Sequence, residues 1–150
     1  MAEMISNRQA RKILAVGLLI GFLLNLSGWL GNNFLLREMW NEIGASVSSV
    51  AWRDSIWRDI FSFAPDFVYG VAICWLYVKL RPSYGSALSA SLRAGLFVAI
   101  VGGITTYFAI SNSGFIPWRL ALASFVLVFA TKLPLAVLAG YLIGSGRQSM

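Results

Sequence analysis

The sequence predicts an all-α integral membrane protein, folded as one domain in an antiparallel bundle of four helices. Of its 150 residues, 58% are hydrophobic and 12% are charged, whereas soluble domains carry about 25% charged residues. The apolar residues gather in four blocks, each long enough to cross a hydrocarbon core of about 30 Å. Because backbone polar groups in lipid must bond internally, we expect each block to be a helix.

The four expected spans cover residues 13–31, 61–80, 94–110 and 118–143. The first follows a basic approach that includes Arg11 and Lys12, as a signal peptide does. However, no A-x-A-like cleavage site follows its apolar core, and the run continues to membrane-spanning length. We therefore expect this block to be retained as a helix.

A short amphipathic helix is expected over residues 49–60, lying in the outer membrane interface. Within it, Ile56 and Ile60 are one turn apart and Trp52 falls on the same side. Two alternatives remain open. The segment could be an ordinary loop held at the interface by its tryptophans, or a surface that binds a partner through Trp52 and Trp57.

Charge predicts the orientation, because Lys and Arg mark the cytoplasmic side of a membrane protein. Acidic residues balance the basic ones in the loop over residues 32–60, but not at the opposite ends of the helices. An even number of spans puts both termini on one side, which we expect to be cytoplasmic. The basic residues on that side are Arg8, Arg11, Lys12, Lys79, Arg81, Arg93 and Arg147.

Small residues recur every four positions in three of the expected helices, a pattern that lets membrane helices approach closely. Such faces could pack the bundle or form a homo-oligomer, and the sequence does not separate the two. The residues are Gly17 and Gly21 in the first span, Gly95, Ala99 and Gly103 in the third, and Ala136, Gly140 and Gly144 in the fourth.

Polar residues from all four spans are expected in one layer in the outer half of the membrane. This layer could be a structural hydrogen-bond network or a polar cavity open to the outside. Its members are Asn25, Asp66, Thr105, Thr106 and Ser124. Asp66 follows Pro65, which favours a first helical turn and a carboxylate that caps the helix. Contact with a substrate or cation, or an ion pair to another helix, are the alternatives.

Lys132 is expected near the membrane midplane, where a charge costs roughly 2.5–3.5 kcal/mol on insertion scales. Its side chain should lean toward the start of its helix, and so toward the polar layer. Pro134 removes the usual donor to the carbonyl of Ala130 and should bend the helix. Lys132 could bond to such freed carbonyls or snorkel to the surface. Its functional alternatives are the binding of an anionic group and proton exchange.

The sequence excludes several kinds of chemistry. It has no histidine, so a His-ligated haem or metal site is excluded, and its single cysteine, Cys74, excludes enzymes that need paired cysteines. No nucleophile or phosphate-loop motif occurs. We expect no cofactor, no metal, no catalytic set and no nucleic-acid partner.

The run Asp66-Phe67-Val68-Tyr69-Gly70, continuing to Trp75 and through Arg81-Pro82-Ser83-Tyr84-Gly85, resembles the central stretch of small uncharacterised bacterial four-span membrane proteins. The resemblance covers the second span and the connection into the third, through Gly95. It implies a four-span fold in a bacterial inner membrane and implies no activity. Lys132 lies outside it.

The leading functional expectation is a non-enzymatic accessory or interaction subunit that works through its helix faces and outer loop. Its partners would be the lipid bilayer and either further copies of itself or a larger membrane complex. The first alternative is a binding or transport protein for a small molecule or ion, with a polar cavity around Asp66 and Lys132. The second is a membrane enzyme of unknown type.

Overall fold

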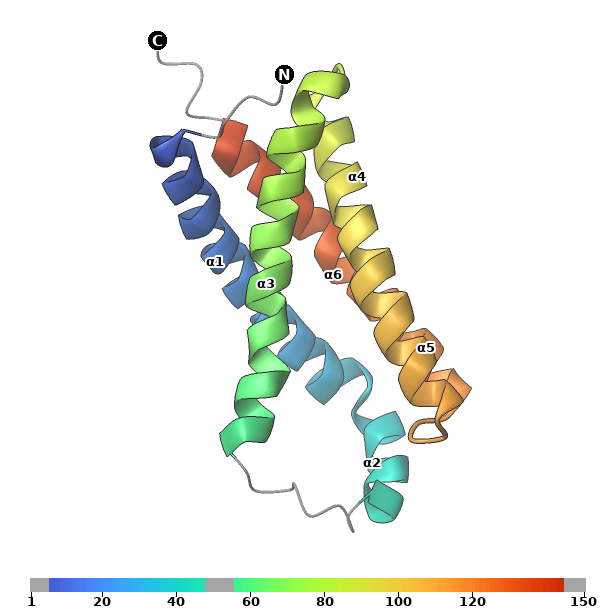
Figure 1. The fold of residues 1–150 in the computed structure, drawn as a ribbon. Coiled ribbons are helices and arrows are strands. Elements are labelled where there is room, and N and C mark those ends of the chain that lie inside the picture. The colour runs from blue at the N-terminus through green and yellow to red at the C-terminus, as the bar shows by residue number, and fades with distance from the viewer. Residues whose placement is uncertain (1–5, 48–55, 145–150) are drawn as a thin grey trace.

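The computed structural model describes residues 6–47 and 56–144, and these residues are helical with short connections and no strand (Figure 1). In chain order the elements are α1 (Asn7–Leu30), η1 (Gly31–Leu35), α2 (Arg37–Val47), α3 (Ile56–Leu80), η2 (Arg81–Ser83), α4 (Ala87–Ala99), η3 (Ile100–Ile104), α5 (Thr105–Asn112) and α6 (Trp118–Gly144). The elements η1 and η3 are π-helical turns, and each continues the α-helix before it.

Four helical stretches are long and apolar enough to cross a membrane, by length and composition. They are Asn7–Leu35, Ser62–Ser83, Ala87–Asn112 and Trp118–Gly144. They coincide with the four expected blocks, although the first and third begin about two turns earlier. Large apolar side chains remain exposed along them, including Phe22 at 56% and Val126 at 67%. Such exposure fits a multi-pass membrane protein, whose outer surface meets lipid.

Glycines bring α1 and α3 into close contact. A Cβ atom added to Gly17 would lie 2.6 Å from Cα of Val71, and one added to Gly21 would lie 2.5 Å from Cα of Phe67. On the facing helix, a Cβ on Gly70 would collide with the carbonyl oxygen of Gly17. Pairing of residue 17 with 71 and of 21 with 67 shows that these two helices run in opposite directions.

Glycines also bring α4 and α6 into close contact. A Cβ atom on Gly95 would lie 2.5 Å from Cβ of Ala136, and one on Gly140 would collide with Oγ of Ser91. These helices also run in opposite directions. The small-residue faces expected from the sequence therefore pack helices within one chain, and in the structure Gly17 and Gly21 are buried against α3.

The loop after the first span differs from the sequence expectation. Residues 48–55, including Trp52, lie outside the described residues, and Trp57 falls in the first turn of α3. Residues 56–60 of the expected helix belong to the first turns of α3, and the rest of that expected helix lies outside the described residues. No glycine or proline interrupts the chain between Ile56 and Pro65, so the helix extends backward from the span.

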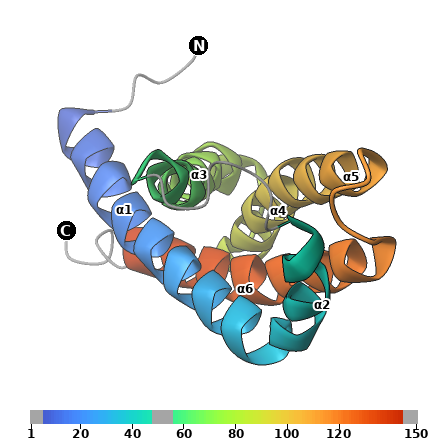
Figure 2. The ribbon, with the colours of Figure 1, turned by 90° about the horizontal axis from the view of Figure 1, so that it is seen from below.

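A short helix does occur earlier in that loop. Two apolar residues hold this helix, Leu36 just before α2 and Ile43 within it. They pack with Ile116, which lies just before α6, and with Leu120 in its first turn, and Figure 2 shows α2 lying over that end of α6. A hydrogen-bonded ion pair between Arg119 and Glu42 spans the contact at 3.2 Å. Exposed pairs of this kind contribute little, so the apolar contact holds α2 in place.

Toward the other end of the molecule, an apolar core fills the bundle and a lysine joins two helices. Ile20 and Ile73 are fully buried there, together with Cys74 and Ala136. Nζ of Lys12 donates a hydrogen bond of 2.9 Å to the carbonyl of Ile143. A cation beside the last carbonyls of a helix is favourable, and this bond ties the start of α1 to the end of α6.

Candidate functional site

Lys132 points into the bundle from near the middle of α6. Its side chain is only 4% exposed, and Nζ lies 3.8 Å from the centroid of the Tyr69 ring on α3. A cation over an aromatic face is attracted by the ring quadrupole, and the attraction grows when water is excluded. In the described part of the chain, Nζ donates no hydrogen bond and has no ion-pair partner in direct contact.

Asp66 supplies the opposite charge from one turn earlier on α3. It is half-buried and interacts electrostatically with Lys132, although the two side chains do not touch as an ion pair. Charges separated in this way still attract each other strongly where little water intervenes. Asp66 and Tyr69 are three residues apart on one helix face, so α3 presents the carboxylate and the ring to Lys132 together.

The helix begins at Ile56, so Pro65 lies inside α3 and not in its first turn. The expectation that Asp66 caps the start of this helix is therefore wrong. Its carboxylate lies more than two turns in, where the first-turn amides and the helix dipole have little effect. The charge that Asp66 meets is the one on α6.

Tyr107 and Ser124 extend the cluster toward the end of the bundle at which α6 begins. Tyr107 interacts electrostatically with Asp66 and Tyr69, and its side chain neighbours Ser124. Ser124 is 1% exposed, yet its Oγ makes no hydrogen bond of normal geometry to any described residue. Buried hydroxyls without a partner are rare in proteins, so this cluster has polar groups that are not satisfied.

A π-helical turn lies beside the cluster. Gly102 in η3 faces Tyr69, and a Cβ atom there would lie 2.7 Å from Cζ and 2.9 Å from the hydroxyl oxygen of the tyrosine. Only glycine leaves room for the ring that Lys132 contacts. Turns of this type are common at functional sites.

The structure gathers three of the six residues expected in a polar cavity, namely Asp66, Ser124 and Lys132. Asn25 instead donates from Nδ2 to the carbonyls of Gly21 and Phe63, both at 3.1 Å, and so ties α1 to α3. Thr105 and Thr106 are exposed on α5, and the Thr105 hydroxyl bonds back to the carbonyl of Val101.

A π-turn directly precedes the two threonines. The sequence places Thr105 and Thr106 in the polar layer by depth alone, which does not decide the face of the helix on which they lie, and η3 adds one residue to its turn of the helix. One residue corresponds to about 100° of rotation. Tyr107 is brought inward in place of the threonines. Sequence reasoning missed Tyr69, Tyr107 and Gly102, because aromatic residues and glycines are common in any membrane helix.

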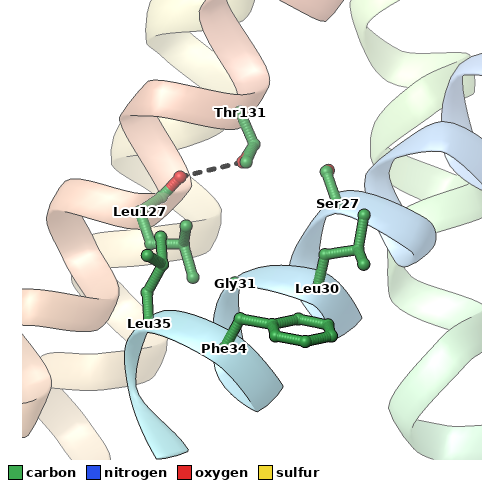
Figure 3. Close-up of a pocket in the computed structure, with 7 residues that line it drawn as sticks. All are labelled: Ser27, Leu30, Gly31, Phe34, Leu35, Leu127 and Thr131. Atoms are coloured by element: carbon green, nitrogen blue, oxygen red, sulfur yellow. Dashed lines mark hydrogen bonds between the residues drawn. The ribbon is translucent and has the colours of Figure 1, made fainter.

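A separate groove runs between α1–η1 and α6 (Figure 3). One part has a volume of about 310 Å³ and an adjoining part about 330 Å³, and both include Ser27, Leu30 and Thr131. The Ser27 hydroxyl bonds to the carbonyl of Leu24 at 3.0 Å, and that of Thr131 to Leu127 at 2.9 Å. The groove is therefore apolar. Thr131 faces it while the next residue, Lys132, faces the polar cluster.

Among the described residues, no three His, Cys, Asp or Glu side chains lie close enough together to hold a metal ion. Comparisons with protein-family models, with curated proteins and with solved structures found no match to this chain.

Proposed function

We propose that the chain is a multi-pass protein of a bacterial plasma membrane, with its four long helices in an antiparallel bundle and both termini in the cytoplasm. The opposite directions of α1 and α3 and of α4 and α6 support this architecture. No acidic residue follows Asp66 in the chain, whereas basic residues surround the connection after α3, which supports the orientation. The resemblance of the second span to small bacterial four-span proteins supports the location.

In this arrangement α2 takes the place of the expected outer interfacial helix. It buries Ile43 against α6 while Arg37 and Glu38 stay exposed, as an amphipathic helix at a membrane surface does. The polar cluster then lies in the outer half of the bundle. The apolar core around Ile20 and Ile73 closes the path to the cytoplasm.

We propose that the cluster binds a small solute or ion that carries an anionic group, and that Lys132 is the anion-binding residue. The observation that carries this proposal is the buried ammonium of Lys132, which has no hydrogen-bond acceptor among the described residues. A buried charge is costly unless it is paired. Asp66 and the Tyr69 ring compensate for it only partly, and an entering anion would accept the hydrogen bonds that Nζ leaves unmade.

Chemical labelling of amines tests this function. A small membrane-impermeant amine reagent is added to the outer face of intact membranes, and the peptides are mapped by mass spectrometry. We expect modification of Lys132, slowed by acetate in excess, and none of Lys12 or Lys79. Lys132→Met supplies the blank.

Modification of Lys132 only after denaturation would contradict the proposal and leave a packed structural lysine. Modification of Lys12 and Lys79 from outside would contradict the orientation alone. Modification of Lys132 that acetate does not slow would leave a water-accessible amine without anion affinity.

An accessory or interaction subunit is the second candidate. It is favoured by three large aromatic side chains that remain exposed near the outer end of α5 and α6. Phe108 is 55%, Phe115 62% and Trp118 48% exposed, and the Phe108 and Trp118 rings meet edge to face at 5.2 Å. Aromatic anchors dominate many protein interfaces. Phe115→Cys, in a Cys74→Ser background, should then give disulfide-linked or cross-linked partners in intact membranes.

A further inference from the structure

The groove between α1–η1 and α6 offers no unmet polar group to an occupant. Its two hydroxyls, on Ser27 and Thr131, are bonded to carbonyls of their own helices. The remaining lining side chains are apolar and include Leu26, Leu30 and Leu135. An occupant therefore needs to be hydrocarbon over the whole length that it places in the groove.

The length of the groove distinguishes between a lipid chain and a partner helix. Along α1–η1 it extends from Leu23 to Leu35, which is about 18 Å at 1.5 Å per residue. One leaflet of the hydrocarbon core is about 15 Å deep, half of the roughly 30 Å total. A transmembrane helix of a partner would extend past the groove into the other leaflet, whereas an acyl chain confined to one leaflet would not.

The groove is also small. Its two adjoining parts share Ser27, Leu30 and Thr131 and have volumes of about 310 and 330 Å³. At one point Gly31 approaches Leu127 so closely that a Cβ atom on the glycine would collide with that side chain. The groove has room for one flexible hydrocarbon chain, which would bend around the contact between Gly31 and Leu127.

From these observations we propose that the groove is a binding site for one acyl chain of a membrane phospholipid, held in a single leaflet. The chain would lie between Leu30 of α1 and Thr131 of α6, on a different face of α6 from Lys132, because consecutive helical residues are about 100° apart. The site is therefore independent of the anion-binding function proposed above.

Native mass spectrometry tests the proposal. The full chain is reconstituted into vesicles of phosphatidylethanolamine and phosphatidylglycerol and then extracted into mild detergent. We expect one phospholipid to remain bound to each chain. Ala130→Phe should lower this occupancy about tenfold, because Ala130 lines the groove and is exposed, so the added ring fills the space without disturbing the core.

Ala109→Phe is the matched control, since Ala109 is exposed on α5 and lies outside the lining, and it should leave the occupancy unchanged. Leu26→Trp, at a second exposed lining residue, repeats the test from α1 if Ala130→Phe fails to fold. Equal lipid retention in all variants would overturn the proposal. So would a dimer of chains that Ala130→Phe dissociates, which would mean that a second copy fills the groove.

Discussion

Nζ of Lys132 lies 3.8 Å from the centre of the Tyr69 ring. This contact joins α6 to α3 in the interior of the bundle, where the ammonium is shielded from lipid. We therefore expect the Tyr69 ring to contribute more to the stability of the protein than the Tyr69 hydroxyl does. Tyr69→Leu should lower the free energy of unfolding by about 1–2 kcal/mol through loss of the cation–π interaction, and Tyr69→Phe by less. Thermal unfolding in detergent micelles measures both, and equal losses would contradict the prediction.

Asp66 and Lys132 should be energetically coupled despite the gap between them. Lys132→Met alone leaves the carboxylate without its cation, and Asp66→Asn alone leaves the ammonium without its anion. We expect the double variant to lose less stability than the two single losses added together, with a coupling of about 0.5–3 kcal/mol. Denaturant unfolding of the four proteins measures this quantity. Strict additivity would show that the two charges act independently.

Gly102 should tolerate no side chain. Gly102→Ala would place a Cβ atom 2.7 Å from Cζ of Tyr69, and overpacking of this kind typically costs 1–3 kcal/mol. A smaller residue at position 69 removes the obstacle, so Gly102→Ala combined with Tyr69→Val should cost less than the sum of the two. If Tyr69→Val does not reduce the cost, the loss of stability in Gly102→Ala would have to arise from the backbone of η3 and not from a collision with the Tyr69 ring.

Gly70→Ala should be the most damaging of the glycine substitutions. The new Cβ atom would meet the carbonyl oxygen of Gly17 and the backbone of Gly21, and backbone cannot move aside as a side chain can. We expect a loss beyond the usual range of about 1–3 kcal/mol, or failure to accumulate in the membrane. Gly28→Ala is the matched control, because a Cβ atom there has no neighbour within 4 Å. Similar behaviour of the two variants would argue against close packing of α1 on α3.

Ser124→Ala should raise the midpoint of thermal unfolding. The Ser124 hydroxyl is buried without a hydrogen bond, and such a group costs roughly 1–3 kcal/mol that alanine does not incur. The effect on ligand protection should be opposite: acetate should slow the labelling of Lys132 less in this variant if Ser124 contacts the anion. A lower midpoint would show that a partner satisfies the hydroxyl.

Much of the fold could be predicted from composition, because length and hydropathy alone define a membrane helix. Helix geometry also predicted that Lys132 leans toward the start of its helix, and so toward the polar layer, but it did not predict which helix it would face. The features that could not be predicted depend on an interruption of the regular helical repeat and on where a helix starts. The π-turn at η3 turned Thr105 and Thr106 outward and brought in Tyr107, and an early start to α3 placed Pro65 inside a helix. Neither leaves a distinct signal in a single sequence.

The bond from Lys12 to the carbonyl of Ile143 has a consequence for biogenesis. During synthesis α6 is made after the other three spans, so the carbonyl that Lys12 binds is not yet present when α1 and α3 emerge from the ribosome. The bond between the start of α1 and the end of α6 can therefore form only after α6 has been made.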